Sequence, residues 1–249
     1  MTARLAHIWR HPVKAIGREE LNRTTLTPGR WLPFDRLWAV AHDRARLDGG
    51  WGAKANFLRG VTEPQLMAAT AALSDDGSTL TLDHPVAGQL TIAPDSDADT
   101  AFLLDWLGRI WPAELPAPTG LYRADSAHLT DMPDPFISIN NTASHRAVSQ
   151  RVGQDLSIHR WRGNLWLDGL GPWQEFEWIG KEIRIGKATL AVRQRITRCK
   201  ATMANPETGR RDADTLGALS TWDHQDFGVY AEVTHGGIIA AGDPVEVPA

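Results

Sequence analysis

The single cysteine of this 249-residue chain, Cys199, lies in the segment of the sequence with the clearest chemical potential. Four cationic residues lie in the run 193–200 around it. Nearby positive charge stabilises a thiolate, which is both a nucleophile and a ligand for soft metals. The alternative is a small buried hydrophobic residue, the commoner fate of a lone cysteine. A polar turn at 205–209 follows, so we expect Cys199 near a strand end, where functional sites are often built.

Other well-known sites are absent from the sequence. One cysteine excludes an intramolecular disulfide and a cysteine-rich zinc or iron–sulfur site. There is no phosphate-binding loop, no dinucleotide fingerprint and no G-x-S-x-G nucleophile motif. His7 and His11 are four residues apart and would lie on one face of a helix. Their segment favours a strand, however, and Pro12 follows it. We therefore expect no metal site at these two histidines.

Composition narrows the class of protein further. Hydrophobic residues make up 42% of the chain and charged residues 22%, which is typical of a soluble globular protein. The formal net charge of −4 argues against nonspecific binding to nucleic acid, which needs clustered cations. No run approaches the roughly 20 apolar residues of a membrane span. Residues 1–9 lack the apolar core of a secretion signal. We expect a cytoplasmic protein that binds neither nucleic acid nor membrane.

Short apolar runs separated by glycine and proline predict a mainly β, α+β protein with a barrel or sandwich and few helices. Asp75-Asp76-Gly77 predicts the turn of a hairpin. Strands are predicted at 4–9, 37–41, 79–82, 89–92, 164–167, 183–185, 189–192, 229–233 and 245–247. Helical periodicity occurs at 102–110 and 144–152, and more weakly at 213–219. In the second of these, Ser144 is the candidate N-cap and Gly153 the terminator.

Prolines crowd the segment between the first two predicted helices, at positions 112, 116, 118, 133 and 135. Such a stretch favours a domain boundary, and we predict domains at 1–120 and 121–249. A long surface connection inside one domain is the alternative.

The C-terminal part, from about 136 to 247, contains five motifs in a consistent order: His159-Arg160-Trp161-Arg162-Gly163-Asn164, residues 175–186, Thr197-Arg198-Cys199, residues 227–231 and residues 242–245. Together they resemble the MOSC family, the domain shared by molybdenum cofactor sulfurases and related reductases. Near the N-terminus, His11-Pro12-Val13-Lys14-Ala15-Ile16-Gly17 resembles the Pro-Val-Lys-Ser opening of the β-barrel domain that often precedes MOSC. Phe34-Asp35-Arg36-Leu37-Trp38 matches the Asp-Arg-x-Trp strand of that family.

The resemblance implies a β-barrel MOSC domain preceded by, and packed on, an N-terminal β-barrel domain. It implies a molybdenum cofactor, Mo-molybdopterin, between the two, with Cys199 as the catalytic residue and protein ligand to the metal. The matched positions imply cofactor-binding roles for Lys14, Arg36, Ser144, Arg162, Asn164, Thr197 and Arg198. A helix N-terminus near Ser144 would be a natural seat for the phosphate. The chain departs from the family pattern at Ala15, where serine is usual, and at Gly163, where proline is usual.

The implied activity is reduction of small N-hydroxylated compounds, such as amidoximes and N-hydroxylated bases. Molybdenum would cycle between Mo(IV) and Mo(VI) and take the oxygen atom of the N–OH group. Electrons would come from a separate donor protein, because the chain has no flavin, nicotinamide or iron–sulfur motif. One alternative is a sulfur-carrier or cofactor-delivery protein that uses a Cys199 persulfide or thiolate, and another is a catalytically silent binding domain. Geometry discriminates: Lys14, Arg36, Arg162 and Cys199 should line one cleft.

Overall fold

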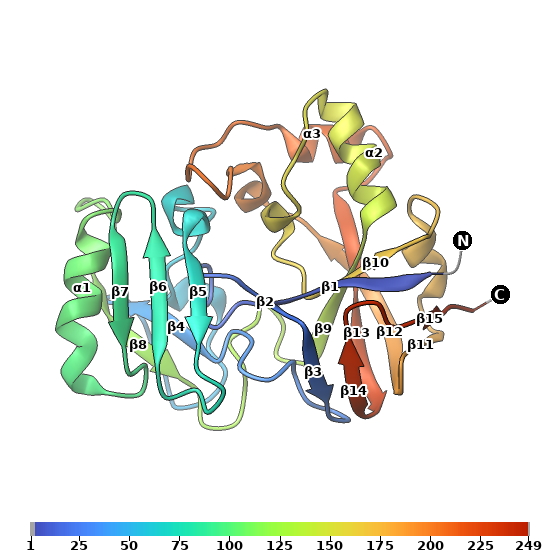
Figure 1. The fold of residues 1–249 in the computed structure, drawn as a ribbon. Coiled ribbons are helices and arrows are strands. Elements are labelled where there is room, and N and C mark those ends of the chain that lie inside the picture. The colour runs from blue at the N-terminus through green and yellow to red at the C-terminus, as the bar shows by residue number, and fades with distance from the viewer. Residues whose placement is uncertain (1–2, 249) are drawn as a thin grey trace.

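A computed structural model describes residues 3–248. Its largest element is an eight-stranded sheet, whose strands alternate apolar and polar residues (Figure 1). The strand order is β15-β11-β12-β13-β9-β10-β1-β2. In chain order these strands are β1 (Arg4–Arg10), β2 (Glu19–Leu21), β9 (Phe136–Asn141), β10 (Leu165–Asp168), β11 (Glu182–Ile185), β12 (Ala188–Thr197), β13 (Asp226–His235) and β15 (Val245–Glu246). Neighbours are antiparallel except β9 and β10, which run parallel.

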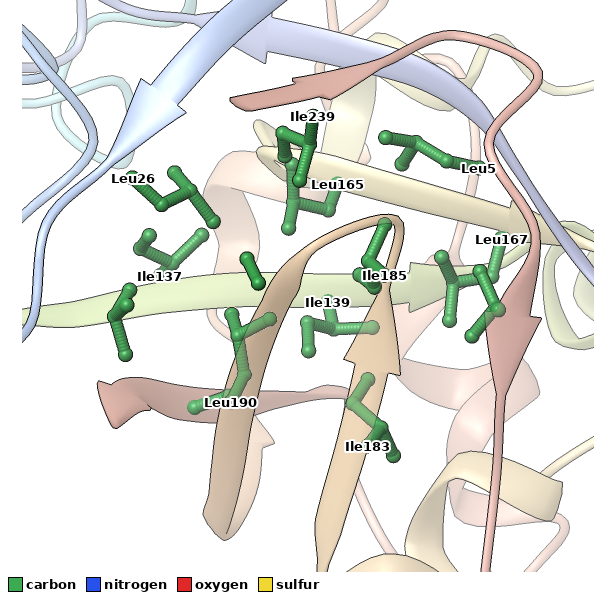
Figure 2. Packing of buried hydrophobic residues seen from close by; sticks show 14 of the residues in the cluster. Leu5, Leu26, Ile137, Ile139, Leu165, Leu167, Ile183, Ile185, Leu190 and Ile239 are labelled. Atoms are coloured by element: carbon green, nitrogen blue, oxygen red, sulfur yellow. The ribbon is translucent and has the colours of Figure 1, made fainter. Parts of the chain in front are cut away.

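The core of this lobe consists of the inward-facing aliphatic side chains of the sheet. Ile137 and Ile139 of β9 are fully buried, with Leu165 and Leu167 of β10 beside them (Figure 2). Leu26 of β3 (Arg23–Leu26) and Ile239 of β14 (Gly237–Ala240) extend the same cluster. β3 and β14 pair with each other antiparallel.

A second lobe contains most of residues 38–123 and has its own apolar core. It comprises the β5-β6-β7 sheet (Thr70–Leu73, Leu80–His84, Gly88–Ile92), the pair β4 (Trp38–His42) and β8 (Pro118–Arg123), and helix α1 (Thr100–Gly108). The predicted hairpin is confirmed. Gly77, with φ +75°, donates its N–H to the carbonyl of Ser74 and closes the turn between β5 and β6.

The two lobes are interleaved along the chain. β1 and β2 come from the N-terminus but pair within the sheet of the C-terminal lobe, and Ile8 of β1 lies opposite Leu165 of β10. This pairing brings the segment that follows β1 next to the residues that precede β10. The boundary at residue 120 stays a prediction.

Helices are few, and the expectation of a mainly β protein is confirmed. α2 (Thr142–Val152) ends at Gly153 in the left-handed conformation, as predicted, but its N-cap is Asn141 and not Ser144. α3 covers Thr215–Ser220. Short 3-10 helices lie at Lys54–Asn56, Pro64–Ala68, Asp97–Asp99, Ile158–Trp161 (η4), Gln174–Trp178 and Lys200–Met203 (η6). Within residues 3–248 no helix is long and apolar enough to cross a membrane.

Candidate functional site

A cleft of about 380 Å³ lies between the two lobes and collects most of the residues predicted for the site. Its volume is in the range typical of small-molecule sites. It brings together Lys14, Arg36, Arg162, Asn164, Thr197, Arg198 and Cys199, and does not include Ser144. Its other walls include Ala15, Lys54, Arg59–Val61, Met67, Asp131, Phe136, Arg160, Trp161, Ala201, Thr202 and Tyr230.

Cys199 lies in the short connection between β12 and η6. β12 ends at Thr197, and Cys199 has extended backbone (φ −124°, ψ 174°) directly before η6. Its carbonyl accepts hydrogen bonds from the N–H and the Oγ1 hydroxyl of Thr202 at 3.1 and 3.0 Å. The backbone is therefore fixed while the thiol is exposed. The position near a strand end is confirmed, and the alternative of a buried filler is wrong.

Two arginines meet at strained turns on the other side of the cleft. Arg36 and Arg162 have φ +48° and +47°, the left-handed region that residues with a Cβ seldom occupy, and Ala15 nearby has φ +65°. Each such residue costs on the order of 1–3 kcal/mol and such residues cluster at ligand sites. Arg36 Nη2 donates to the carbonyl of Arg162 at 2.6 Å. Burial, and then the charge of Arg36, lowers the pKa of Arg162. Arg36 therefore fixes the backbone of the Arg162 turn, and the two positive charges make the potential of this part of the cleft positive.

Asp35 fixes Arg36 from behind. It is 2% exposed, and its Oδ2 accepts a hydrogen bond from Arg36 Nη1 at 2.5 Å while its Oδ1 accepts the backbone N–H of His11 at 2.8 Å. Burial acts to raise the pKa of Asp35, but the Arg36 guanidinium and His11 together outweigh it and hold this pKa well below its usual range. Asp35 is therefore a buried carboxylate that orients Arg36. Sequence reasoning gave it no role, although it directly precedes Arg36 in the matched motif.

Lys14 is 7% exposed and is held by two acceptors at the cleft wall. Its Nζ donates to the carbonyl of Leu129 at 2.9 Å and to Asp131 Oδ1 at 2.6 Å. Burial lowers the pKa of Lys14 even though Asp131 acts to raise it. Asp131 is the one carboxylate among the described residues that line the cleft. The sequence did not single it out, because it lies in the proline-rich stretch that favoured a domain boundary.

Arg198 lines the cleft, but most of its guanidinium N–H groups donate hydrogen bonds to oxygen atoms of the protein. Nε donates to the carbonyl of Phe227 at 2.8 Å, and Nη2 to the same carbonyl at 2.5 Å and to Asn140 Oδ1 at 3.2 Å. Nη1 donates to the carbonyl of Trp161 at 2.9 Å, directly before the turn at Arg162. Burial lowers the pKa of Arg198 to about 10. The geometry makes Arg198 a clamp between the Cys199 segment and the Arg162 turn.

Asn140 explains why glycine replaces the usual proline at position 163. A Cβ on Gly163 would lie 1.9 Å from Asn140 Nδ2, and a Cβ on Gly228 would lie 2.6 Å from Asn140 Oδ1. The amide of Asn140 thus occupies the space between these two glycines. From there its oxygen accepts the hydrogen bond from Arg198.

The side chains of Asn164 and Thr197 also have partners within the protein. Asn164 Oδ1 accepts from the N–H and hydroxyl of Ser138 at 3.2 and 2.8 Å, and its Nδ2 donates to the carbonyl of Trp9 at 3.1 Å. Asn164 therefore joins β9 to β1 across the floor of the cleft. Thr197 is exposed, and its hydroxyl donates to Asp226 at 2.7 Å.

Ser144 was expected near a phosphate at the start of α2, and a carboxylate of the protein occupies that place. The Ser144 hydroxyl is fully buried and donates to Glu175 at 2.8 Å, and it accepts the backbone N–H of Trp173. Asn141 Nδ2 donates to the same carboxylate at 2.8 Å. The Glu175 carboxyl therefore lies at the start of α2, and the Ser144 hydroxyl is hydrogen-bonded within the protein and lies outside the cleft.

Glu175→Gln should remove a pH dependence of stability. Burial raises the pKa of Glu175 despite its hydrogen bonds. The folded state therefore holds the proton more tightly than the unfolded state, so this group's stabilising contribution is full below the unfolded pKa and is lost as pH rises through the folded pKa. Relative to Glu175→Gln, the wild type should lose up to about 1.4 kcal/mol per pH unit across that window. Urea unfolding of both proteins from pH 4 to 8 measures the difference. A constant difference across this range would contradict it.

The residues of the cleft fit an anionic, thiol-ligated cofactor. The exposed Cys199 thiol is a soft donor. Arg162 uses one Nη2 hydrogen bond, to the carbonyl of Val13, which leaves its other donors free. Arg160 is 3% exposed, and its Nε has no partner within the described residues. Within residues 3–248 no cluster of three or more His, Cys, Asp or Glu is placed to hold a metal ion. The arrangement places unbonded guanidinium donors and an exposed thiol around one cleft.

Comparisons with known proteins agree with the order of the motifs. The family model described as the MOSC N-terminal beta barrel domain matches residues 2–106, and the one described as the MOSC domain matches residues 126–246. Mitochondrial amidoxime-reducing component 1 of Mus musculus is 22% identical over 290 residues, covering 97% of this chain and 81% of that protein. The crystal structure of the YUAD protein from Bacillus subtilis aligns with a TM-score of 0.50 at 12% identity, covering 98% of this chain and 94% of that one, which shows a shared fold.

Proposed function

Because the chain belongs to the MOSC family, with a MOSC N-terminal beta barrel domain before its MOSC domain, we propose that it binds a molybdenum cofactor and reduces N-hydroxylated compounds. Its distant relationship to mitochondrial amidoxime-reducing component 1 supports amidoximes as a substrate class. The observation that carries the proposal is the cleft in which an exposed Cys199 thiol is joined by Arg36 and Arg162.

Each side chain has a distinct task in this proposal. The bound cofactor would supply the metal that changes oxidation state and accepts the oxygen of the N–OH group. Cys199 would bind that metal as a thiolate. Arg162 would hold the cofactor's phosphate with its free donors, and Arg36, oriented by Asp35, would support it. Lys14 would add a point charge beside Asp131. Arg198 would keep the Cys199 segment at a fixed distance from the Arg162 turn.

Electrons would reach this site from a separate donor protein. An artificial donor can replace it in a test. Protein produced in a cofactor-competent host should reduce a panel of amidoximes and N-hydroxylated bases when supplied with reduced viologen. If loaded protein reduces none of them, the proposed activity is wrong.

A second candidate function is favoured by the exposure of the thiol. A sulfur-carrier or cofactor-delivery protein would hold a persulfide on Cys199, and an exposed thiol can be reached by a partner enzyme. Mass spectrometry of the intact protein separates the two functions. A labile addition of one sulfur on Cys199, without molybdenum, supports the carrier, and its absence supports the reductase.

A further inference from the structure

Arg59 is a cleft-lining cation that no sequence motif singles out. Its residue is half-buried, and within residues 3–248 its guanidinium has no hydrogen bond, ion pair or aromatic partner. A charge held partly out of water without a partner costs free energy, which a bound anion would offset.

Among the described residues that line the cleft, Lys54 also has no side-chain partner, but it is exposed to water, and Arg162 has one side-chain hydrogen bond, to the carbonyl of Val13. The remaining cations are bonded more extensively. Arg198 makes four hydrogen bonds to protein oxygens, and Lys14 makes two. Arg36 is bonded to Asp35 and to the carbonyl of Arg162. Arg59 therefore keeps all five of its N–H donors for a ligand.

Arg59 enters the cleft at the same end as the Cys199 thiol. The next residue, Gly60, packs against η6, since a Cβ on Gly60 would lie 3.8 Å from the Cβ of Ala201. The carbonyl of Val61 accepts a hydrogen bond from Arg211 Nη2 at 2.7 Å, which ties the same segment to the loop after η6. Because η6 begins directly after Cys199, Arg59 reaches the cleft at the end where the thiol lies.

We propose that Arg59 is the substrate-recognition residue of this cleft and binds a carboxylate or phosphate group carried by the N-hydroxylated substrate. This inference rests on the proposed function. A free guanidinium forms paired hydrogen bonds with such planar or tetrahedral anions. The field of the cleft also favours them, because Asp131, the one carboxylate among its described lining residues, is bonded to Lys14.

The test uses two aromatic amidoximes that differ only in a carboxylate on the ring. In Arg59→Gln, KM for the carboxylated compound should rise about tenfold, because a charge-assisted hydrogen bond is lost. KM for the neutral compound should change less than about twofold, and kcat should stay near that of the wild type for both. Arg59→Lys should fall between. The matched control is Arg30→Gln, an exposed arginine outside the cleft, which should change neither KM.

Calorimetric titration of the same protein preparations with both compounds measures binding without turnover. If the wild type reduces neither compound, the proposed function fails, and a loss of carboxylate preference in Arg59→Gln still supports the anion site. If both compounds are reduced and bound equally by wild type and variant, Arg59 has no such role and the function stands. Molybdenum and pterin content should be unchanged in Arg59→Gln. A fall would mean that Arg59 holds the cofactor's own phosphate, which would overturn the proposal.

Discussion

Cys199→Ser should yield a folded protein whose reductase activity is at background. The Cys199 side chain is exposed and its local hydrogen bonds are made by the backbone carbonyl, so the free energy of unfolding should change by less than about 0.5 kcal/mol. A serine hydroxyl is a hard donor that stays protonated, and it replaces a thiolate poorly on molybdenum. Part of the pterin should remain, because Arg162 and Lys14 are unchanged. Thermal melts, pterin content and viologen-coupled turnover are the measurements.

Cys199→Ala separates loss of the thiol from gain of a hydroxyl. It should behave as Cys199→Ser does in all three measurements. If either variant retains most of the wild-type turnover, Cys199 is not the metal ligand.

Gly163→Ala should have the largest effect on stability. The new Cβ would lie 1.9 Å from Nδ2 of Asn140, whose side chain is fully buried. Overpacking of this kind costs about 3 kcal/mol. That cost corresponds to a fall in Tm of roughly 6–12 °C for a chain of this size. Displacing Asn140 would also disturb Arg198 and the turn at Arg162, so cofactor content should fall as well.

A double-mutant cycle identifies the cause. Asn140→Ala removes the amide, so the pair Asn140→Ala with Gly163→Ala should melt higher than Gly163→Ala alone. The matched control is Gly171→Ala, because a Cβ there meets nothing closer than 3.8 Å, and its Tm should stay close to that of the wild type. Equal losses from Gly163→Ala with and without Asn140 would show that the clash lies elsewhere.

Local patterns in the sequence were enough for much of the fold. Alternation predicted the strands at 4–9 and 229–233, and Gly153 predicted the end of α2. Several short or polar strands were missed, among them β2, β3 and β14, because three or four residues carry too little periodicity. Their pairing partners lie far away in the sequence and decide their conformation.

In the site too, local motifs predicted some residues, while contacts between residues distant in the sequence determine the rest. The motifs pointed to Lys14, Arg36, Arg162 and Cys199, and the structure lines one cleft with them. Ser144 lies outside this cleft, and its hydroxyl is bonded to Glu175, 31 residues further on, which no local pattern could indicate. The sequence also could not show which guanidinium N–H groups of the cleft remain unbonded. Whether an arginine is hydrogen-bonded within the protein depends on carbonyl groups that are distant in the sequence. Arg198 uses the carbonyls of Trp161 and Phe227 in this way.

The central claim is that this cleft holds a molybdenum cofactor with Cys199 on the metal. Its most direct test is the molybdenum and pterin content of the wild-type protein, purified from a host that makes the cofactor, with Cys199→Ser beside it. We expect close to one molybdenum and one pterin per wild-type chain, and much less molybdenum in the variant. Wild-type protein from such a host that contains neither molybdenum nor pterin would contradict the account.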